Sequence, residues 1–105
     1  MKINNRELEV MAILGEAGRP LISTEIVKTG KGLTQSTVQA VLRKLMNNDM
    51  VEVQGVTHSG NVLSRQFALT QKGKSELLND FIRHYNQIRS IVSKQEILDA
   101  IIKEN

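Results

Sequence analysis

Residues 34–54 read TQSTVQAVLRKLMNNDMVEVQ, and the spacing of the apolar residues changes within this stretch. In the first half, apolar residues recur three and four positions apart, which is the spacing of one face of an α-helix. They are Val38, Val41, Leu42, Leu45 and Met46. In the second half, Val51 and Val53 alternate with polar residues, as is typical of a strand. The stretch therefore predicts a helix over 35–48, capped by Thr34, followed directly by a strand.

Two further helices are expected before this stretch. Asn4 and Glu7 have the spacing of a capping box, which begins a helix. This helix is expected to end at Gly18 and to bury an apolar stripe. The stripe comprises Leu8, Met11, Ala12, Leu14 and Ala17. A short helix is expected over 24–29 with Ser23 as its cap, and the short turn after it contains glycine, as a helix-turn-helix requires.

After the strand, a loop is expected over 55–61 and a return strand over 62–69, with Phe67 and Leu69 facing inward. The order helix, short helix, helix and hairpin is that of a winged helix-turn-helix domain. We therefore predict a mainly α fold with a small antiparallel β-hairpin, and we assign residues 1–70 to a winged-helix DNA-binding domain.

Residues 71–105 are expected to form helices for dimerisation. One apolar stripe repeats at steps of three and four residues up to Val92, and Ser93 with Glu96 forms a second capping box that opens a final helix. The winged-helix unit could fill its own core without these helices, so their apolar faces favour a homodimer. The alternative is that both helices fold back onto their own domain. The residues expected at the dimer interface are Leu78, Phe81, Tyr85, Ile88, Val92, Ile97, Leu98 and Ile101.

The length of 105 residues fits one small domain with appended helices, and the composition indicates an aliphatic core. Only 3% of the residues are aromatic, so the chain lacks the platforms on which proteins stack single-stranded nucleic acid. It contains no cysteine, which excludes disulfides, thiol catalysis and zinc sites built on cysteine. No apolar run approaches the roughly 18 residues of a membrane span. We therefore expect a cytoplasmic protein with no membrane partner.

The positive charge is concentrated in the middle of the chain. The net charge is +3, but residues 19–74 carry eight basic and three acidic side chains, a net charge of +5. A basic middle between neutral-to-acidic ends is typical of a nucleic-acid-binding protein, although an ordinary solvated surface would also account for it.

The outward face of the helix expected over 35–48 carries no acidic residue. It combines amide, hydroxyl, small and basic side chains, which are the types that read base edges in the major groove. The residues expected to face bases are Gln35, Ser36, Thr37, Gln39, Ala40 and Arg43. Phosphate contacts are expected from Lys31, Lys44 and Arg65, and the tip of the hairpin adds His58 and Asn61. Double-stranded DNA is therefore the expected partner.

No residue pattern in the sequence indicates an enzyme. Gly55 and Gly60 have the spacing of a phosphate-binding loop, but Asn61 and Val62 stand where lysine and serine or threonine would be needed. The two histidines lie in different elements without a carboxylate cluster beside them. We expect no catalytic residues, no metal and no cofactor.

Three segments carry a resemblance to a known family: residues 7–11 (ELEVM), 37–45 (TVQAVLRKL) and 59–65 (SGNVLSR). They resemble the penicillinase-repressor family of bacterial winged-helix regulators, which includes the beta-lactamase, methicillin-resistance and copper-responsive repressors. The resemblance implies a homodimer, joined through C-terminal helices, that binds a palindromic operator and represses transcription. The chain lacks the cysteine pairs of the copper-responsive members, and no residues establish a cleavage site, so neither an inducing ligand nor a protease is assigned.

Two alternatives stay open at this point. Residues 69–73 (LTQKG) resemble the strand-to-helix join of the MarR and PadR regulators, which would imply a ligand-responsive protein with a pocket between the winged helix and the terminal helices. The modest charge would also suit a winged-helix protein-interaction module without DNA binding.

Overall fold

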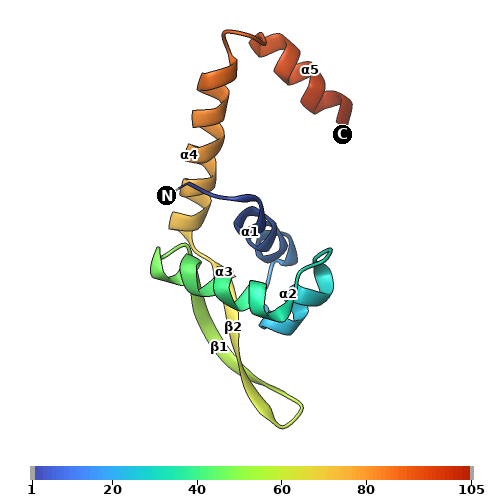
Figure 1. Ribbon diagram of the computed structural model, residues 1–105, viewed down its shortest axis with the longest axis vertical. Coiled ribbons are helices and arrows are strands. Elements are labelled where there is room, and N and C mark those ends of the chain that lie inside the picture. Colours follow the sequence, from blue (N-terminus) through green and yellow to red (C-terminus); the bar gives the residue numbers. More distant parts are fainter. Residues whose placement is uncertain (1, 105) are drawn as a thin grey trace.

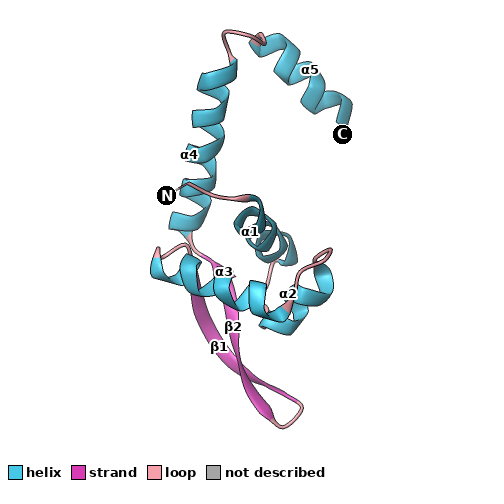
Figure 2. Ribbon diagram, viewed as in Figure 1, coloured by secondary structure: helices cyan, strands magenta, loops and turns pink. Residues whose placement is uncertain are grey.

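The computed structural model describes residues 2–104, which form five helices and one two-stranded antiparallel hairpin (Figure 1). Met1, where the expected DNA-binding domain (1–70) begins, and Asn105, where the expected dimerisation segment (71–105) ends, lie outside the described residues. The mainly helical fold with a small hairpin confirms the predicted fold class (Figure 2). The elements are α1 (Asn5–Ala17), α2 (Ser23–Thr29), α3 (Gln35–Asn47), β1 (Val51–Ser59), β2 (Val62–Leu69), α4 (Gln71–Ile88) and α5 (Lys94–Glu104).

The core lies where α1, α2, α3 and the base of the hairpin meet. The apolar face predicted for α3 is buried, with Met46 packed at its edge. The N–H group of Leu21 donates to the carbonyl of Phe67 (2.9 Å), and the N–H of Phe67 donates back to Leu21 (2.7 Å). This bridge fastens the segment before α2 to β2. It therefore holds the helices and the hairpin as one unit.

The capping box of Asn4 and Glu7 is present at the start of α1, but the buried face of this helix differs from the predicted stripe. Val10 and Ile13 fill the core beside the predicted Met11 and Leu14. The prediction is wrong at Leu8, Ala12 and Ala17, which are exposed. The reason is that the Glu7 side chain is itself buried, so the face of α1 that includes this carboxylate turns inward.

The start of α2 is also different from the prediction. The helix begins at Ser23, with Ile22 in the cap position. Glu25 satisfies the open end of the helix, because its Oε1 accepts a hydrogen bond from the N–H of Ile22 (3.1 Å). The Ser23 hydroxyl is free to accept from Nε2 of Gln35 at the start of α3 (2.7 Å).

The predicted loop over 55–61 is wrong, because β1 continues to Ser59. A bulge between Val53 and Gly55 shifts the register, after which pairing resumes up to the Gly60–Asn61 turn. Gly60 has a φ of 64°, the left-handed backbone that a two-residue hairpin turn requires. The outer part of the hairpin extends beyond the core (Figure 2). Because neither of its faces packs against the core, its sequence need not alternate between apolar and polar residues.

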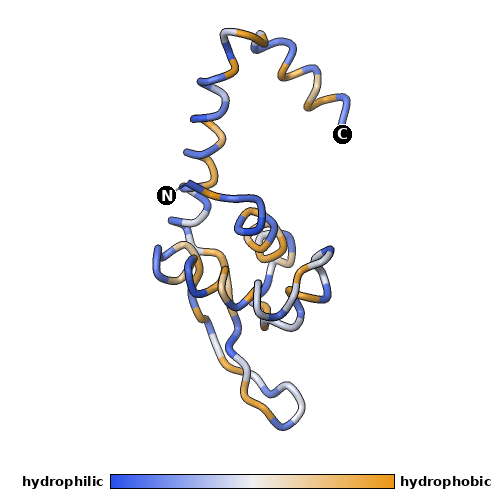
Figure 3. The backbone as a smooth tube through the Cα atoms, viewed as in Figure 1, coloured by the Kyte–Doolittle hydropathy of each residue, from blue (hydrophilic) through white to orange (hydrophobic). Residues whose placement is uncertain are grey.

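Helix α4 leaves the winged-helix unit and α5 continues from its far end (Figure 1). The radius of gyration is 16.0 Å, against about 13 Å for a compact chain of this length. Apolar residues recur along both helices (Figure 3), yet Leu77 is the one large apolar side chain of α4 that packs against the core. Folding back onto the same domain, the alternative to dimerisation, is therefore not the arrangement of this chain. No helix within residues 2–104 is long and apolar enough to cross a membrane.

The joins of the C-terminal helices confirm the capping box predicted at Ser93 and correct one boundary. Thr70 caps α4, where its hydroxyl accepts from the N–H of Gly73 (2.9 Å). Ser93 and Glu96 form the predicted reciprocal pair at the start of α5. Helix α4 ends at Ile88, so Val92 lies in the connection between the two helices rather than on the stripe of α4.

Candidate nucleic-acid interface

An open groove of about 480 Å³ lies between α3 and β2. Three α3 side chains with a spacing of four residues, Gln35, Gln39 and Arg43, line one wall, because this spacing places them on one helix face. Ser64 and Arg65 of β2 line the opposite wall. The groove therefore brings two of the predicted cations and two of the predicted amides to one place.

The solvent face of α3 has the composition expected from the sequence. Ser36, Gln39, Ala40 and Arg43 are exposed. No acidic side chain lies anywhere along α3. An exposed helix face with amide, hydroxyl and guanidinium donors and no carboxylate suits the negatively charged, acceptor-rich major groove of DNA.

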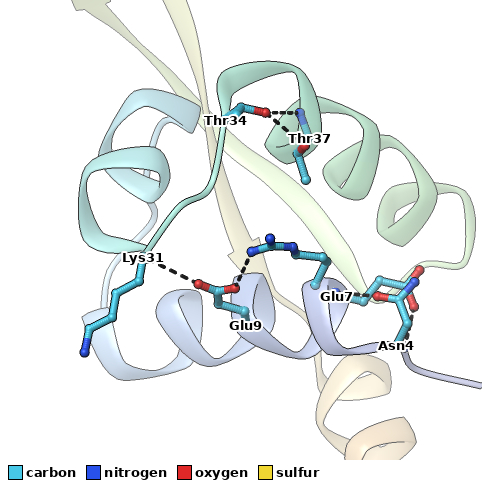
Figure 4. A network of polar contacts seen from close by, with 7 residues as sticks. Asn4, Glu7, Glu9, Lys31, Thr34 and Thr37 are labelled. Atoms are coloured by element: carbon cyan, nitrogen blue, oxygen red, sulfur yellow. Dashed lines mark hydrogen bonds and ion pairs between the residues drawn. The ribbon is translucent and has the colours of Figure 1, made fainter.

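Two residues at the start of α3 are held by hydrogen bonds within the protein. The N–H of Thr37 donates to Oγ1 of Thr34 (3.2 Å), whose hydroxyl in turn donates to Oγ1 of Thr37 (2.9 Å; Figure 4). Gln35 donates from Nε2 to Ser23. These contacts fix both side chains before any partner arrives, which lowers the entropic cost of using them in recognition.

The predicted phosphate contacts differ in their surroundings. Lys31 is bound through its backbone N–H to Oε1 of Glu9 (3.3 Å), while its side chain extends away from that contact (Figure 4). The ammonium of Lys44 lies 2.7 Å from Oε2 of Glu7. The guanidinium carbon of Arg65 lies 5.4 Å from the centre of the Phe67 ring, within the range of a cation–π contact. Lys31 and Arg65 are thus available to a partner, whereas Lys44 is paired.

The two predicted residues of the hairpin tip lie apart from the groove. His58 is on β1 opposite Leu63, and Asn61 is in the turn. Both are exposed. They extend the candidate surface along the hairpin without lining its centre.

Apart from Leu42, Met46 and Phe67, which were expected in the core, five further groove residues were not predicted from the sequence. They are Ser23 and Thr24 of α2 and Val62, Leu63 and Ser64 of β2. Leu63 could have been found, because alternate residues of a strand share a face and Phe67 was expected to point inward. Ser23 and Thr24 had no such signal, since only the packing of α2 against α3 places them beside the groove.

The residues expected at a dimer interface are mostly exposed in the single chain. Leu78 has 61% of its surface exposed and Phe81 has 54%. Ile88, Leu98 and Ile101 are exposed as well, and Tyr85, Val92 and Ile97 are half-buried. Within residues 2–104, no group of three or more histidine, cysteine, aspartate or glutamate side chains could hold a metal ion.

The chain is similar to several solved structures. The similarity to hsRosR-S1, solved in a complex, has a TM-score of 0.64 at 16% identity and covers 97% of this chain and 90% of that one. The similarity to the YusO protein from Bacillus subtilis has a TM-score of 0.62 at 21% identity and covers 97% of this chain and 72% of that one. The similarity to the adhesin competence repressor from Streptococcus pyogenes has a TM-score of 0.52 at 19% identity and covers 97% of this chain and 77% of that one. No protein-family model and no curated protein matches the sequence. These similarities show that the chain has the winged-helix fold.

Proposed function

We propose that this protein is a sequence-specific, double-stranded-DNA-binding transcriptional regulator that acts as a homodimeric repressor. The observation that carries the proposal is the exposed, acid-free face of α3, which borders a groove with Arg43 on one wall and Arg65 on the other. In a winged helix this helix is free to enter the major groove while the hairpin lies beside it. The name of the adhesin competence repressor, whose fold is similar, is consistent with the repressor role.

The proposed contacts follow from the positions of the side chains. The base-facing set comprises Gln35, Ser36, Thr37, Gln39, Ala40 and Arg43. Arg43 would bind guanine with two hydrogen bonds, and Gln39 would bind adenine. Lys31 and Arg65 would hold phosphates, and His58 with Asn61 would reach the DNA backbone from the hairpin.

The exposed apolar faces of α4 and α5 support a homodimer. A second copy would cover the side chains of Leu78 and Phe81, which the single chain leaves in water. Two copies related by a two-fold axis would read two half-sites about 34–36 Å apart, and the operator would be palindromic. Residues 1–70 would then bind DNA and residues 71–105 would dimerise, in a protein that works in the cytoplasm. These features agree with the resemblance to the penicillinase-repressor family.

A ligand-responsive regulator is a second candidate. A hollow of about 260 Å³ lies where α1, β2 and α4 meet, lined by Leu14, Leu69 and Lys74 among others. A molecule bound there would contact both the winged helix and the helix that leads away from it. Such a ligand would raise the melting temperature and weaken DNA binding.

The experiment that tests the DNA-binding proposal compares Arg43→Ala with Arg89→Ala. Both changes remove one positive charge, but Arg89 lies at the far end of α4, away from the groove. On an operator selected from random sequences, Arg43→Ala should cost about 1–3 kcal/mol and Arg89→Ala little. If Arg43→Ala loses the same binding free energy on the operator and on random DNA, Arg43 contacts only phosphate. If Arg43→Ala and Arg89→Ala lose equal binding free energy on the operator, α3 does not lie in the DNA interface.

A further inference from the structure

Glu7 is the one charged side chain that is buried within residues 2–104, with only 1% of its surface exposed. Both of its carboxylate oxygens have partners. Oε1 accepts a hydrogen bond from the N–H of Asn4 (2.9 Å), and Oε2 lies 2.7 Å from the ammonium of Lys44. The pair joins the first turn of α1 to the last turn of α3, the proposed recognition helix.

The partners differ sharply in exposure. The Lys44 side chain is 54% exposed, so its stem runs over the surface while its ammonium meets the buried carboxylate. If the ammonium moved to a DNA phosphate, Glu7 would keep its charge out of water with no cation beside it. Leaving a buried charge unpaired is strongly unfavourable. The carboxylate therefore holds Lys44 more firmly than an exposed ion pair would.

We propose that Glu7 withholds Lys44 from DNA, so that Lys44 positions α3 against α1 and contributes no phosphate contact. The proposal rests on the DNA-binding function proposed above and replaces the expectation that Lys44 touches the DNA backbone. It also makes Glu7 a determinant of DNA affinity, although this side chain is buried beneath the surface and touches no DNA.

Glu7→Gln is the informative change. Glutamine is as suitable as glutamate at this position of a capping box, so the Asn4 contact is kept. The neutral amide no longer holds the ammonium, and Lys44 becomes free to bind a phosphate. Each phosphate contact steepens the dependence of log K on log salt by about 0.9. A dimer that gains two contacts should therefore bind random DNA more tightly at low salt, with a slope steeper by up to about 1.8.

The experiment compares the wild type with Glu7→Gln, Lys44→Met and the double variant. Salt titrations on a random duplex give the slope, and thermal unfolding gives stability. We expect Glu7→Gln to steepen the slope. Lys44→Met should keep the wild-type slope but unfold at a lower temperature, because Glu7 loses its cation. The double variant should keep the wild-type slope and regain most of the lost stability.

The outcomes separate this proposal from the one on which it rests. A Lys44→Met slope that is shallower than the wild type by about 0.9 per protomer would make Lys44 a phosphate contact and overturn the proposal. If the wild type binds DNA but Glu7→Gln has the same slope, the proposal about Glu7 and Lys44 is overturned while the DNA-binding function stands. A wild type without salt-dependent binding would overturn the DNA-binding function and this proposal together.

Discussion

Replacing Gly73 with alanine should change how α4 leaves the winged helix. Gly73 lies in the first turn of α4, directly against the turn between α3 and β1. An added Cβ would lie 2.8 Å from Cδ1 of Leu69 and closer still to the carbonyl oxygen of Met50. That oxygen also accepts a hydrogen bond from the N–H of Thr70 (3.1 Å), so it is not free to move aside.

The cost follows from the kind of atom in the way. A side chain could rotate, but a hydrogen-bonded carbonyl can move only with its backbone. Forcing one extra carbon into a packed site costs about 1–3 kcal/mol, and the greater helix preference of alanine returns up to about 1 kcal/mol. We expect a net loss of about 1–2 kcal/mol in the free energy of unfolding. For a chain of this size, the melting temperature should fall by roughly 5–10 °C.

Gly15 in α1 provides the matched control. A Cβ added there would meet only Cδ2 of Leu69 at 3.9 Å, an ordinary contact. Gly15→Ala should therefore stabilise the protein by up to about 1 kcal/mol. Thermal unfolding followed by circular dichroism measures both variants. A Gly73→Ala protein that melts at or above the wild-type temperature would refute the close packing of α4 on the α3–β1 turn.

Three further changes test other parts of the structure. Phe81→Glu should place a charge on the exposed apolar face of α4 and shift the protein to monomers in sedimentation, while Arg83→Glu on the same helix should not; an unchanged mass would remove α4 from the interface. Glu25→Gln should lower the melting temperature slightly at pH 7, because the Arg19 guanidinium, with the Ile22 N–H, lowers the pKa of the Glu25 carboxyl in the folded chain. The ionised Glu25 carboxylate stabilises the folded chain at pH values above the unfolded pKa of about 4.3, and this contribution is lost as the pH falls through the lower folded pKa. The difference in melting temperature between the wild type and Glu25→Gln should therefore shrink below pH 4. Arg65→Ala should weaken DNA binding equally on operator and random DNA, as for a phosphate contact; a loss confined to the operator would contradict that role.

The sequence was most informative where local patterns and burial agree. The apolar spacing of α3 matches its buried face, and the capping pairs at Asn4 and Ser93 occur where they were predicted. Both signals are local, since a cap needs four consecutive residues and a helix face needs a few turns. The order of these elements was enough to predict the winged helix.

The errors arose where distant residues decide the outcome. The buried face of α1 includes Glu7, whose cation comes from Lys44, 37 positions along the chain. No local pattern contains that pair, so neither the face of α1 nor the pairing of Lys44 could be predicted. The length of β1 was missed for a different reason, because hydrogen bonds alone define a strand beyond the core and its side chains carry no burial pattern.

The central claim is that the α3 face and the hairpin together bind double-stranded DNA. The most direct test is a salt-titrated binding measurement on a random duplex, with light scattering on the same sample to give the mass. We expect a dimer whose affinity for DNA falls steeply as the salt concentration rises, because phosphate contacts release counterions. A dimer with no affinity for DNA even at low salt would contradict the account and favour a winged-helix module that binds another protein.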